Sequence, residues 1–177
     1  MNYFENERSN LTNFHHLSLF RVSKIPYAFP FFLRHGHQLP SLHFDVPNVE
    51  LDRLLDECPN LEDLVISFRF LVLRAMGFIS FSHPKVRQIG LRDVMDAFSG
   101  LTQPHALAPA LDEVANWVSI SKRFPNLSCI RLLDVSSRKF NTAMDNEELK
   151  EVWEGFIFWL EEEGVDLEDQ KGQKIYA

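Results

Sequence analysis

The chain has 177 residues, the length of one domain, and it carries a net charge of -7. Its hydrophobic content of 45% and charged content of 24% exclude a disordered chain, and its acidity argues against a nucleic-acid binder that neutralises phosphates. No apolar run is long enough to span a membrane, and no signal peptide is visible. The two cysteines do not form a disulfide scaffold, so we expect a cytoplasmic or nuclear protein.

One short pattern recurs along the chain, with apolar residues at its first, fourth and sixth positions. The first three intervals between its starts are 25, 22 and 25 residues, within the range of leucine-rich repeats, and the last is 41. Its occurrences are Phe14-Leu17-Leu19, Leu39-Leu42-Phe44, Leu61-Leu64-Ile66, Val86-Ile89-Leu91 and Leu127-Ile130-Leu132. The alternating half of each pattern is typical of a short strand with one buried face.

Three of the patterns follow a bulky residue, a proline and then Asn or Lys. They read CPNLEDLVI (58–66), HPKVRQIGL (83–91) and FPNLSCIRL (124–132). Because proline ends a helix and disfavours helical geometry in the residue before it, each unit is predicted to be a helix, a turn and a strand. Units of this size cannot bury their apolar face alone, so we expect them to stack into a parallel sheet backed by helices.

Helical stripes of apolar residues fill the segments between the strands. They occur at 49–58 and 111–124, a short helix is expected at 25–36, and residues 68–81 fit a helix or a strand. The segment 96–109 contains Gly, Ser and two Pro, which predicts an inserted loop. The clearest helix is 145–164, with Asp145 as its expected N-cap, and residues 165–177 are expected to be a tail.

The segments around these turns resemble a known family. CPNLEDLVI and the preceding VELDRLLDE resemble the cysteine-containing class of leucine-rich repeat found in F-box proteins. The stretches FFLRHGHQLPSLHF (31–44), RFPNLSCIRLLDV (123–135) and GVDLEDQKG (164–172) are similar to the C-terminal repeats of F-box-like proteins of mushroom-forming fungi. The resemblance covers roughly residues 11–172. The resemblance implies that this chain is the substrate-binding part of a ubiquitin ligase subunit.

We therefore expect residues 1–177 to form one irregular α/β leucine-rich-repeat solenoid, with short parallel strands backed by helices. The repeats span about 11–135, and a helix at about 145–164 caps the last of them. The Leu-Pro start of an F-box is not found, since Leu39-Pro40 opens a strand instead. An adaptor and a cullin are therefore expected only if an F-box lies upstream. A free-standing decoy or regulatory fragment is the alternative.

The side chains that alternate with the buried ones form the expected binding surface. Neighbouring strands lie about 4.8 Å apart, so these residues make one continuous face that suits a protein ligand without catalysis or cofactor. The expected surface residues are His16, Ser18, Phe20, Ser41, His43, Asp45, Asp63, Val65, Ser67, Gln88, Arg92 and Arg131.

A metal-dependent hydrolase is a further alternative, because five of the seven histidines lie within the first 43 residues. No HExxH or CxxC spacing accompanies them, and His15 and His16 would point to opposite faces of a strand, so we expect no metal. The sequence predicts a buried, inert thiol at Cys58 and an exposed one at Cys129.

The C-terminal region concentrates the negative charge. Residues 145–169 hold eleven acidic residues and one basic residue, Lys150, whereas the rest of the chain holds 14 acidic and 17 basic residues. A solvated outer face of the capping helix accounts for this concentration most simply. The alternative is an acidic docking surface for a basic partner.

Overall fold

The computed structural model describes residues 17–20, 29–45, 51–68, 82–95, 104–118 and 123–176. The helices and strands in these ranges are, in chain order, β1 (Leu17–Phe20), α1 (Phe29–His35), the 3-10 helix η2 (Gly36–Gln38), β2 (Ser41–Asp45), α2 (Leu51–Asp56), β3 (Asp63–Ser67), β4 (Gln88–Arg92), α5 (Pro104–Val118), β5 (Cys129–Leu132), α6 (Ser137–Ala143), α7 (Glu147–Glu162) and β6 (Asp166–Glu168).

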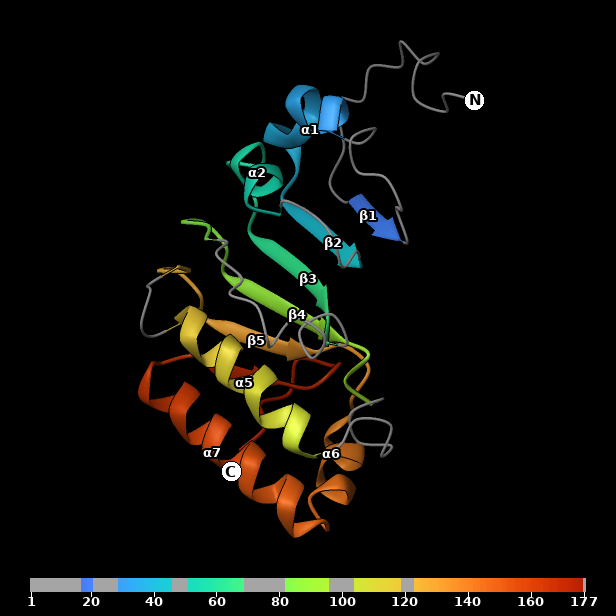
Figure 1. Ribbon diagram of the computed structural model, residues 1–177, viewed down its shortest axis with the longest axis vertical. Helices are drawn as coiled ribbons and strands as arrows, with labels where there is room; N and C mark the ends of the chain where they lie inside the picture. Colours follow the sequence, from blue (N-terminus) through green and yellow to red (C-terminus); the bar gives the residue numbers. More distant parts are fainter. Residues whose placement is uncertain are drawn as a thin grey trace.

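The strands form one sheet in which spatial order follows sequence order, from β1 to β6, and all neighbours are parallel. Figure 1 shows the strands stacked along the long axis, with β1 towards one end and β5 towards the other. The predicted pattern sets the register, because Leu42, Leu64, Ile89 and Ile130 pair in successive strands. The predicted α/β architecture with parallel strands and helices is confirmed.

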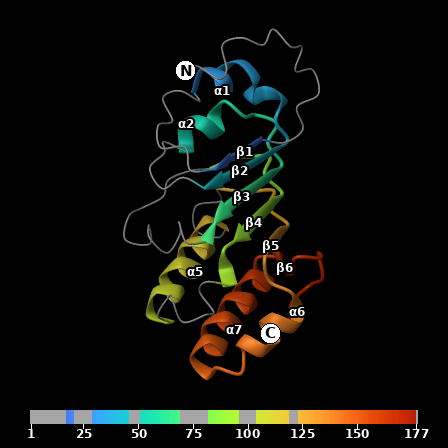
Figure 2. The same ribbon diagram turned by 90° about the vertical axis from the view of Figure 1, so that its right-hand side faces the viewer.

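The core lies between the sheet and its helices. The pattern residues Leu42, Leu64, Ile89 and Ile130 are all fully buried, and Leu54 and Leu107 contribute to the same core from α2 and α5. Figure 2 shows α2 and α5 on the same side of the sheet. The helical side chains therefore cover one face, and the alternate strand residues belong to the other.

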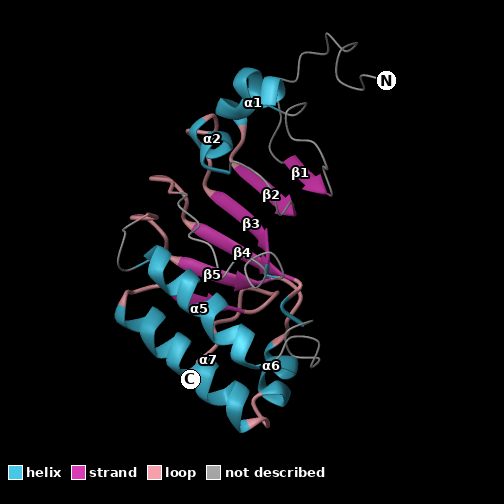
Figure 3. Ribbon diagram, viewed as in Figure 1, coloured by secondary structure: helices cyan, strands magenta, loops and turns pink. Residues whose placement is uncertain are grey.

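Hydrogen bonds made by side chains in the turns explain why Pro-Asn precedes two of the strand patterns. Asn60 Nδ2 donates to the His37 carbonyl oxygen over 2.7 Å, and Asn126 Nδ2 donates to the Pro84 carbonyl oxygen over 2.6 Å. In both cases a residue next to the strand pattern bonds to the turn of the preceding unit. Lys85 holds the matching position in the unit between them, and its Nζ donates to Asn60 Oδ1 over 2.7 Å. These bonds align the points at which successive strands begin (Figure 3).

The expected loop at 96–109 is corrected over its second half, because α5 begins at Pro104. Proline is tolerated at the first position of a helix, where its missing N–H has no intrahelical partner. Pro109 lies inside the helix but is exposed, so its ring does not disturb the core. Residues 96–103 of that segment lie outside the described residues, as do the first pattern's Phe14 and nearly all of 68–81.

The expected tail is also corrected, since residues 166–168 form β6, the sixth parallel strand. Leu167 pairs with Ile130, so the next core position along the chain is Asp169, directly after the strand, rather than an apolar residue. This polar residue breaks the apolar pattern, so the sequence did not predict the strand. Helix α6 was likewise not predicted, and its N-cap is Ser136, whose side chain accepts from the Lys139 N–H.

Asp169 is 1% exposed and its carboxylate is fully engaged with neighbouring donors. Oδ2 accepts from the N–H and hydroxyl of Ser137 over 3.0 and 2.7 Å, and Oδ1 accepts from the N–H groups of Lys171 and Gln173 over 2.8 and 2.9 Å. Burial raises the pKa of this carboxyl, but the hydrogen bonds from Ser137, Gln173 and Lys171 outweigh it and lower the pKa to about 2. The bonds tie the C-terminal turn to α6.

The capping helix α7 begins one residue later than expected. Asn146, not Asp145, is the N-cap, and its Oδ1 accepts from the N–H groups of Glu148 and Leu149. Asn and Asp cap equally well, so the sequence did not distinguish the neighbours. The inner face buries Trp153 against Phe140 and Phe156 with edge-to-face rings. The predicted amphipathic helix is thus confirmed.

Candidate functional site

A row of hydrogen-bonded polar side chains crosses the sheet on the face opposite the core. Ser41, Asp63 and Gln88 are direct neighbours on β2, β3 and β4. Asp63 accepts from the Ser41 hydroxyl over 2.9 Å and from Gln88 Nε2 over 3.3 Å. All three are half-buried. Because the carboxylate is held by donors on both sides, this part of the face is ordered before any partner arrives.

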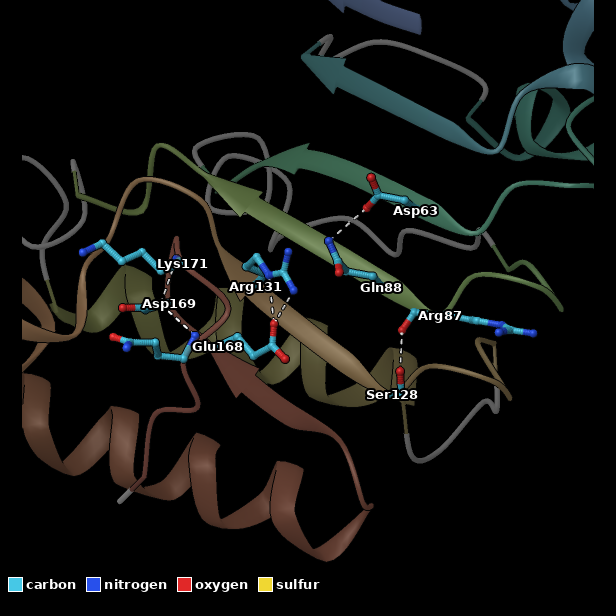
Figure 4. A network of polar contacts seen from close by, with 9 residues as sticks. Asp63, Arg87, Gln88, Ser128, Arg131, Glu168, Asp169 and Lys171 are labelled. Atoms are coloured by element: carbon cyan, nitrogen blue, oxygen red, sulfur yellow. Dashed lines mark hydrogen bonds and ion pairs between the residues drawn. The ribbon is translucent and has the colours of Figure 1, made fainter. Parts of the chain in front are cut away.

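An ion pair continues the face over β5 and β6. Arg131 and Glu168 are direct neighbours, and Nε and Nη2 of Arg131 lie 2.8 and 2.6 Å from Glu168 Oε2. Their side chains are 32% and 19% exposed. The hydrogen bond to Glu168 raises the pKa of Arg131 above its ordinary value. Figure 4 shows this pair and the Asp63–Gln88 bond on neighbouring strands.

Gly90 separates these two polar groups. A Cβ at this position would lie 2.9 Å from both Val65 Cγ2 and Leu133 Cδ1, so the absence of a side chain lets these two aliphatic groups close over the strand. Val65 is 2% exposed and Gly90 is buried, whereas Leu133 is half-buried. The centre of the face is therefore apolar and its two flanks are polar.

Two predicted surface residues are corrected by their burial. Val65 is 2% exposed beside Gly90, and Ser67 is 3% exposed, with its hydroxyl donating to Asp93 Oδ2 over 2.6 Å. Neither side chain is available to a partner. Asp93 follows β4 directly and adopts a φ of 62°, a left-handed geometry that aspartate tolerates. Sequence alternation gives the face of a side chain but not the neighbours that cover it.

The other predicted surface residues fall into three groups. Ser41, His43, Asp63, Gln88, Arg92 and Arg131 are half-buried residues of β2 to β5. Ser18, Phe20 and Asp45 occupy neighbouring positions in β1 and β2, where the structure describes the backbone. His16 lies outside the described residues. The structure therefore brings six of the predicted side chains together on one face, and Glu168 is a member that the sequence did not suggest.

Both cysteines are buried and held as neutral thiols. Burial raises the pKa of Cys58 to about 12, with a further contribution from the charge of Glu57. Burial and the Glu168 carboxylate raise the pKa of Cys129 to about 12 as well. Cys129 is 8% exposed, so the prediction that its thiol is exposed is wrong. Neither thiol is set up as a thiolate nucleophile at neutral pH.

The outer face of α7 is acidic and carries one large exposed aromatic residue. Phe158 is 63% exposed, and a shallow hollow beside it is lined by Gly155 and by charged residues of the same helix. Lys150 Nζ lies 4.0 Å from Glu154 Oε1, so this glutamate has a basic neighbour within the helix.

The histidines considered for the alternative of a metal site are spread over several elements in the described part of the chain. His35 is the last residue of α1, His37 belongs to η2 and His43 lies on β2, whereas His15 and His16 are outside the described residues. Among residues 17–20, 29–45, 51–68, 82–95, 104–118 and 123–176, no group of three or more His, Cys, Asp or Glu residues is arranged to hold a metal ion.

No protein-family model, curated protein or solved structure matches the chain. Within the segments that the structure describes, no helix is long and apolar enough to cross a membrane.

Proposed function

We propose that the protein is a non-catalytic recognition module, a leucine-rich-repeat solenoid that binds a protein segment on its exposed sheet face. The parallel strands in sequence order and the asparagine bonds between successive turns support the solenoid. Each unit contacts its sequence neighbours through the same backbone and turn positions, as stacked repeats do.

The observation that carries the binding proposal is the composition of the face across β2 to β6. It combines an apolar centre, where the half-buried Leu133 side chain lies over Gly90, with Asp63 on one flank and Arg131 on the other. Side chains that already bond to one another lose little freedom when a partner binds, which favours affinity. An apolar centre with a polar, charged rim is also the usual anatomy of a protein interface.

Selection from a displayed library of random peptides tests this proposal and requires no identified partner. We expect enriched peptides whose affinity falls at least about tenfold, equivalent to about 1.4 kcal/mol, in the charge-removing variants Asp63→Asn and Arg131→Gln. Glu151→Gln, on the exposed outer face of α7, is the matched control and should bind normally. Peptides that depend on Glu151 and ignore both face variants would contradict the proposal.

Resemblance to F-box-like proteins extends the proposal to the substrate-receptor part of a ubiquitin ligase subunit in the cytoplasm or nucleus. That role requires a module that binds a Skp-type adaptor and, through it, a cullin. The test is whether the native transcript encodes an F-box-like module in frame upstream of Met1, and whether that longer chain co-purifies with the adaptor. A transcript that starts directly before Met1 would remove the ligase role and leave recognition alone.

A further inference from the structure

His83 connects three consecutive turns at the edge of the sheet where the strands begin. It is 3% exposed. Its Nε2 lies 3.0 Å from the carbonyl oxygen of Cys58 in the preceding turn, and its backbone N–H donates over 2.8 Å to the carbonyl oxygen of Arg123 in the following one. Its Nδ1 lies 3.2 Å from the backbone nitrogen of Lys85 in its own turn. One buried residue therefore joins the units that contain β3, β4 and β5.

These contacts fix the protonation state of the ring. A backbone N–H can only donate, so Nδ1 must accept from Lys85 and carry no proton. The proton is then on Nε2, which donates to the Cys58 carbonyl oxygen. Both nitrogen atoms are satisfied only in this neutral form. A second proton on Nδ1 would place two donors against each other in a buried site.

The surroundings disfavour the charged ring. Burial lowers the pKa of His83 most strongly, the bond to the Cys58 carbonyl opposes that shift, and the ammonium group of Lys85 lowers the pKa further. Asp56, the last residue of α2, acts weakly in the opposite direction. The Cys58 thiol is neutral, because its pKa is raised to about 12. Together these effects keep His83 neutral in the folded protein and lower its pKa below the ordinary value.

We propose that His83 is a pH-sensitive latch: a proton gained at Nδ1 breaks the bond to Lys85 and opens the turn that leads into β4. Lys85 also bonds to Asn60, and the N–H groups of Arg87 and Gln88 donate to the Glu62 carbonyl oxygen over 2.8 and 3.1 Å. Opening the turn therefore loosens the junction between β3 and β4. The latch is a property of the fold and does not depend on the proposed binding function.

The direction of the pH dependence follows from the lowered pKa. A base that is held neutral in the folded state stabilises it fully above the ordinary histidine pKa of about 6.5. That contribution is lost as the pH falls from there towards the lower pKa of the folded state. If the opened turn returns His83 to ordinary solvation, the equilibrium for opening rises by up to about tenfold at pH 5.5.

Amide hydrogen exchange measures the opening directly. The rates at Lys85, Arg87 and Gln88 are compared at pH 7.5 and pH 5.5 after correction for the intrinsic rates. We expect exchange to be enhanced at the lower pH in the native protein. The variant His83→Gln keeps a donor for the Cys58 carbonyl but cannot titrate, so it should lose the enhancement. His37→Gln, at an exposed position in η2, is the matched control and should retain it.

Unchanged exchange in the native protein, or an enhancement that survives in His83→Gln, would overturn the latch. Should that variant fail to fold, nitrogen-15 spectra of the native imidazole give the same decision. The latch requires a neutral ring with its proton on Nε2 and a titration midpoint below about 6.5. A midpoint at or above that value, or a proton on Nδ1, would contradict it.

Discussion

Buried polar residues mark the joints between units of this fold. Ser67, His83 and Asp169 are each at most 3% exposed, and each bonds to a residue of another unit or element. A buried polar group left without a partner costs about 1–3 kcal/mol, so each of these side chains penalises any misplacement of its neighbour. This role could not be predicted from the sequence, because a single Ser, His or Asp between apolar residues fits a surface position as readily as a buried joint.

Asp169→Asn should lower the free energy of unfolding at pH 7 by on the order of 2 kcal/mol, because the carboxylate accepts four hydrogen bonds. The pKa of about 2 in the folded state lies below the ordinary value, so the charged form favours folding. This stabilisation is complete above about pH 4 and is lost as the pH falls towards 2.

Urea unfolding of the native protein and of Asp169→Asn at pH 7 and pH 2.5 measures this difference. The gap between the two proteins should shrink at the lower pH. Asp166→Asn, three residues earlier at the start of β6 and half-exposed beside Lys174, is the control and should cost less than about 1 kcal/mol. An equal cost at both pH values would show that the charge of Asp169 is not what stabilises the turn.

At the scale of elements, close approach of backbones restricts some positions to glycine. A Cβ on Gly36 would overlap the carbonyl oxygen of Glu57, which is backbone and cannot move aside. Gly36→Ala should therefore destabilise the protein by about 1–3 kcal/mol or more. Gly155→Ala is the matched control, because a Cβ there meets nothing within 4 Å on the outer side of α7.

Thermal unfolding of both variants checks the contrast. Gly155→Ala should raise the midpoint, since alanine favours a helix over glycine by up to about 1 kcal/mol. Equal effects of the two substitutions would mean that η2 does not contact the end of α2 closely enough to exclude a Cβ.

The bonds between turns predict a smaller effect. Asn126→Ala removes the bond to the Pro84 carbonyl oxygen and should lower the free energy of unfolding by about 0.5–1.5 kcal/mol. Asn141→Ala, at an exposed position on α6, should change it by less than about 0.5 kcal/mol. Denaturant midpoints distinguish the two, and an Asn126 effect no larger than that of Asn141 would show that the turn bonds do not stabilise the stack.

The strands that the sequence predicted are those in which every core position is apolar. The patterns at Leu42, Leu64, Ile89 and Ile130 pair in one register, as expected from alternation alone. The sequence did not predict β6, because the polar Asp169 takes the core position directly after it. It did not predict the start of α5, because Pro104 and Pro109 are typical of loops. Local patterns describe these segments poorly, since contacts with α6 and with the rest of the core stabilise them.

The candidate face was predicted in position but not in detail. Alternation placed Asp63, Gln88 and Arg131 on one side of the sheet, and the structure shows two of them bonded to each other. The alternation of the sequence did not reveal that Val65 and Leu133 close over Gly90, because that contact joins residues far apart in the chain. Nor did it predict Glu168, whose strand was missed.

At the scale of the whole molecule, charge is segregated. The acidic residues of α7 face solvent at one end of the sheet, where the helix packs beside α5 and closes the stack. On the sheet face, by contrast, Arg131 forms an ion pair with Glu168, and Asp63 is held by the neutral side chains of Ser41 and Gln88. This division favours a structural role for the acidic helix and a recognition role for the sheet.

Mapping a selected peptide onto the protein by amide chemical-shift perturbation tests this division most directly. We predict that the largest shifts cluster at Asp63, Gln88, Arg131 and Glu168, with small changes along the outer face of α7. Shifts centred on Phe158 and its acidic neighbours, with an unperturbed sheet face, would contradict recognition through the sheet and assign the binding surface to the helix instead.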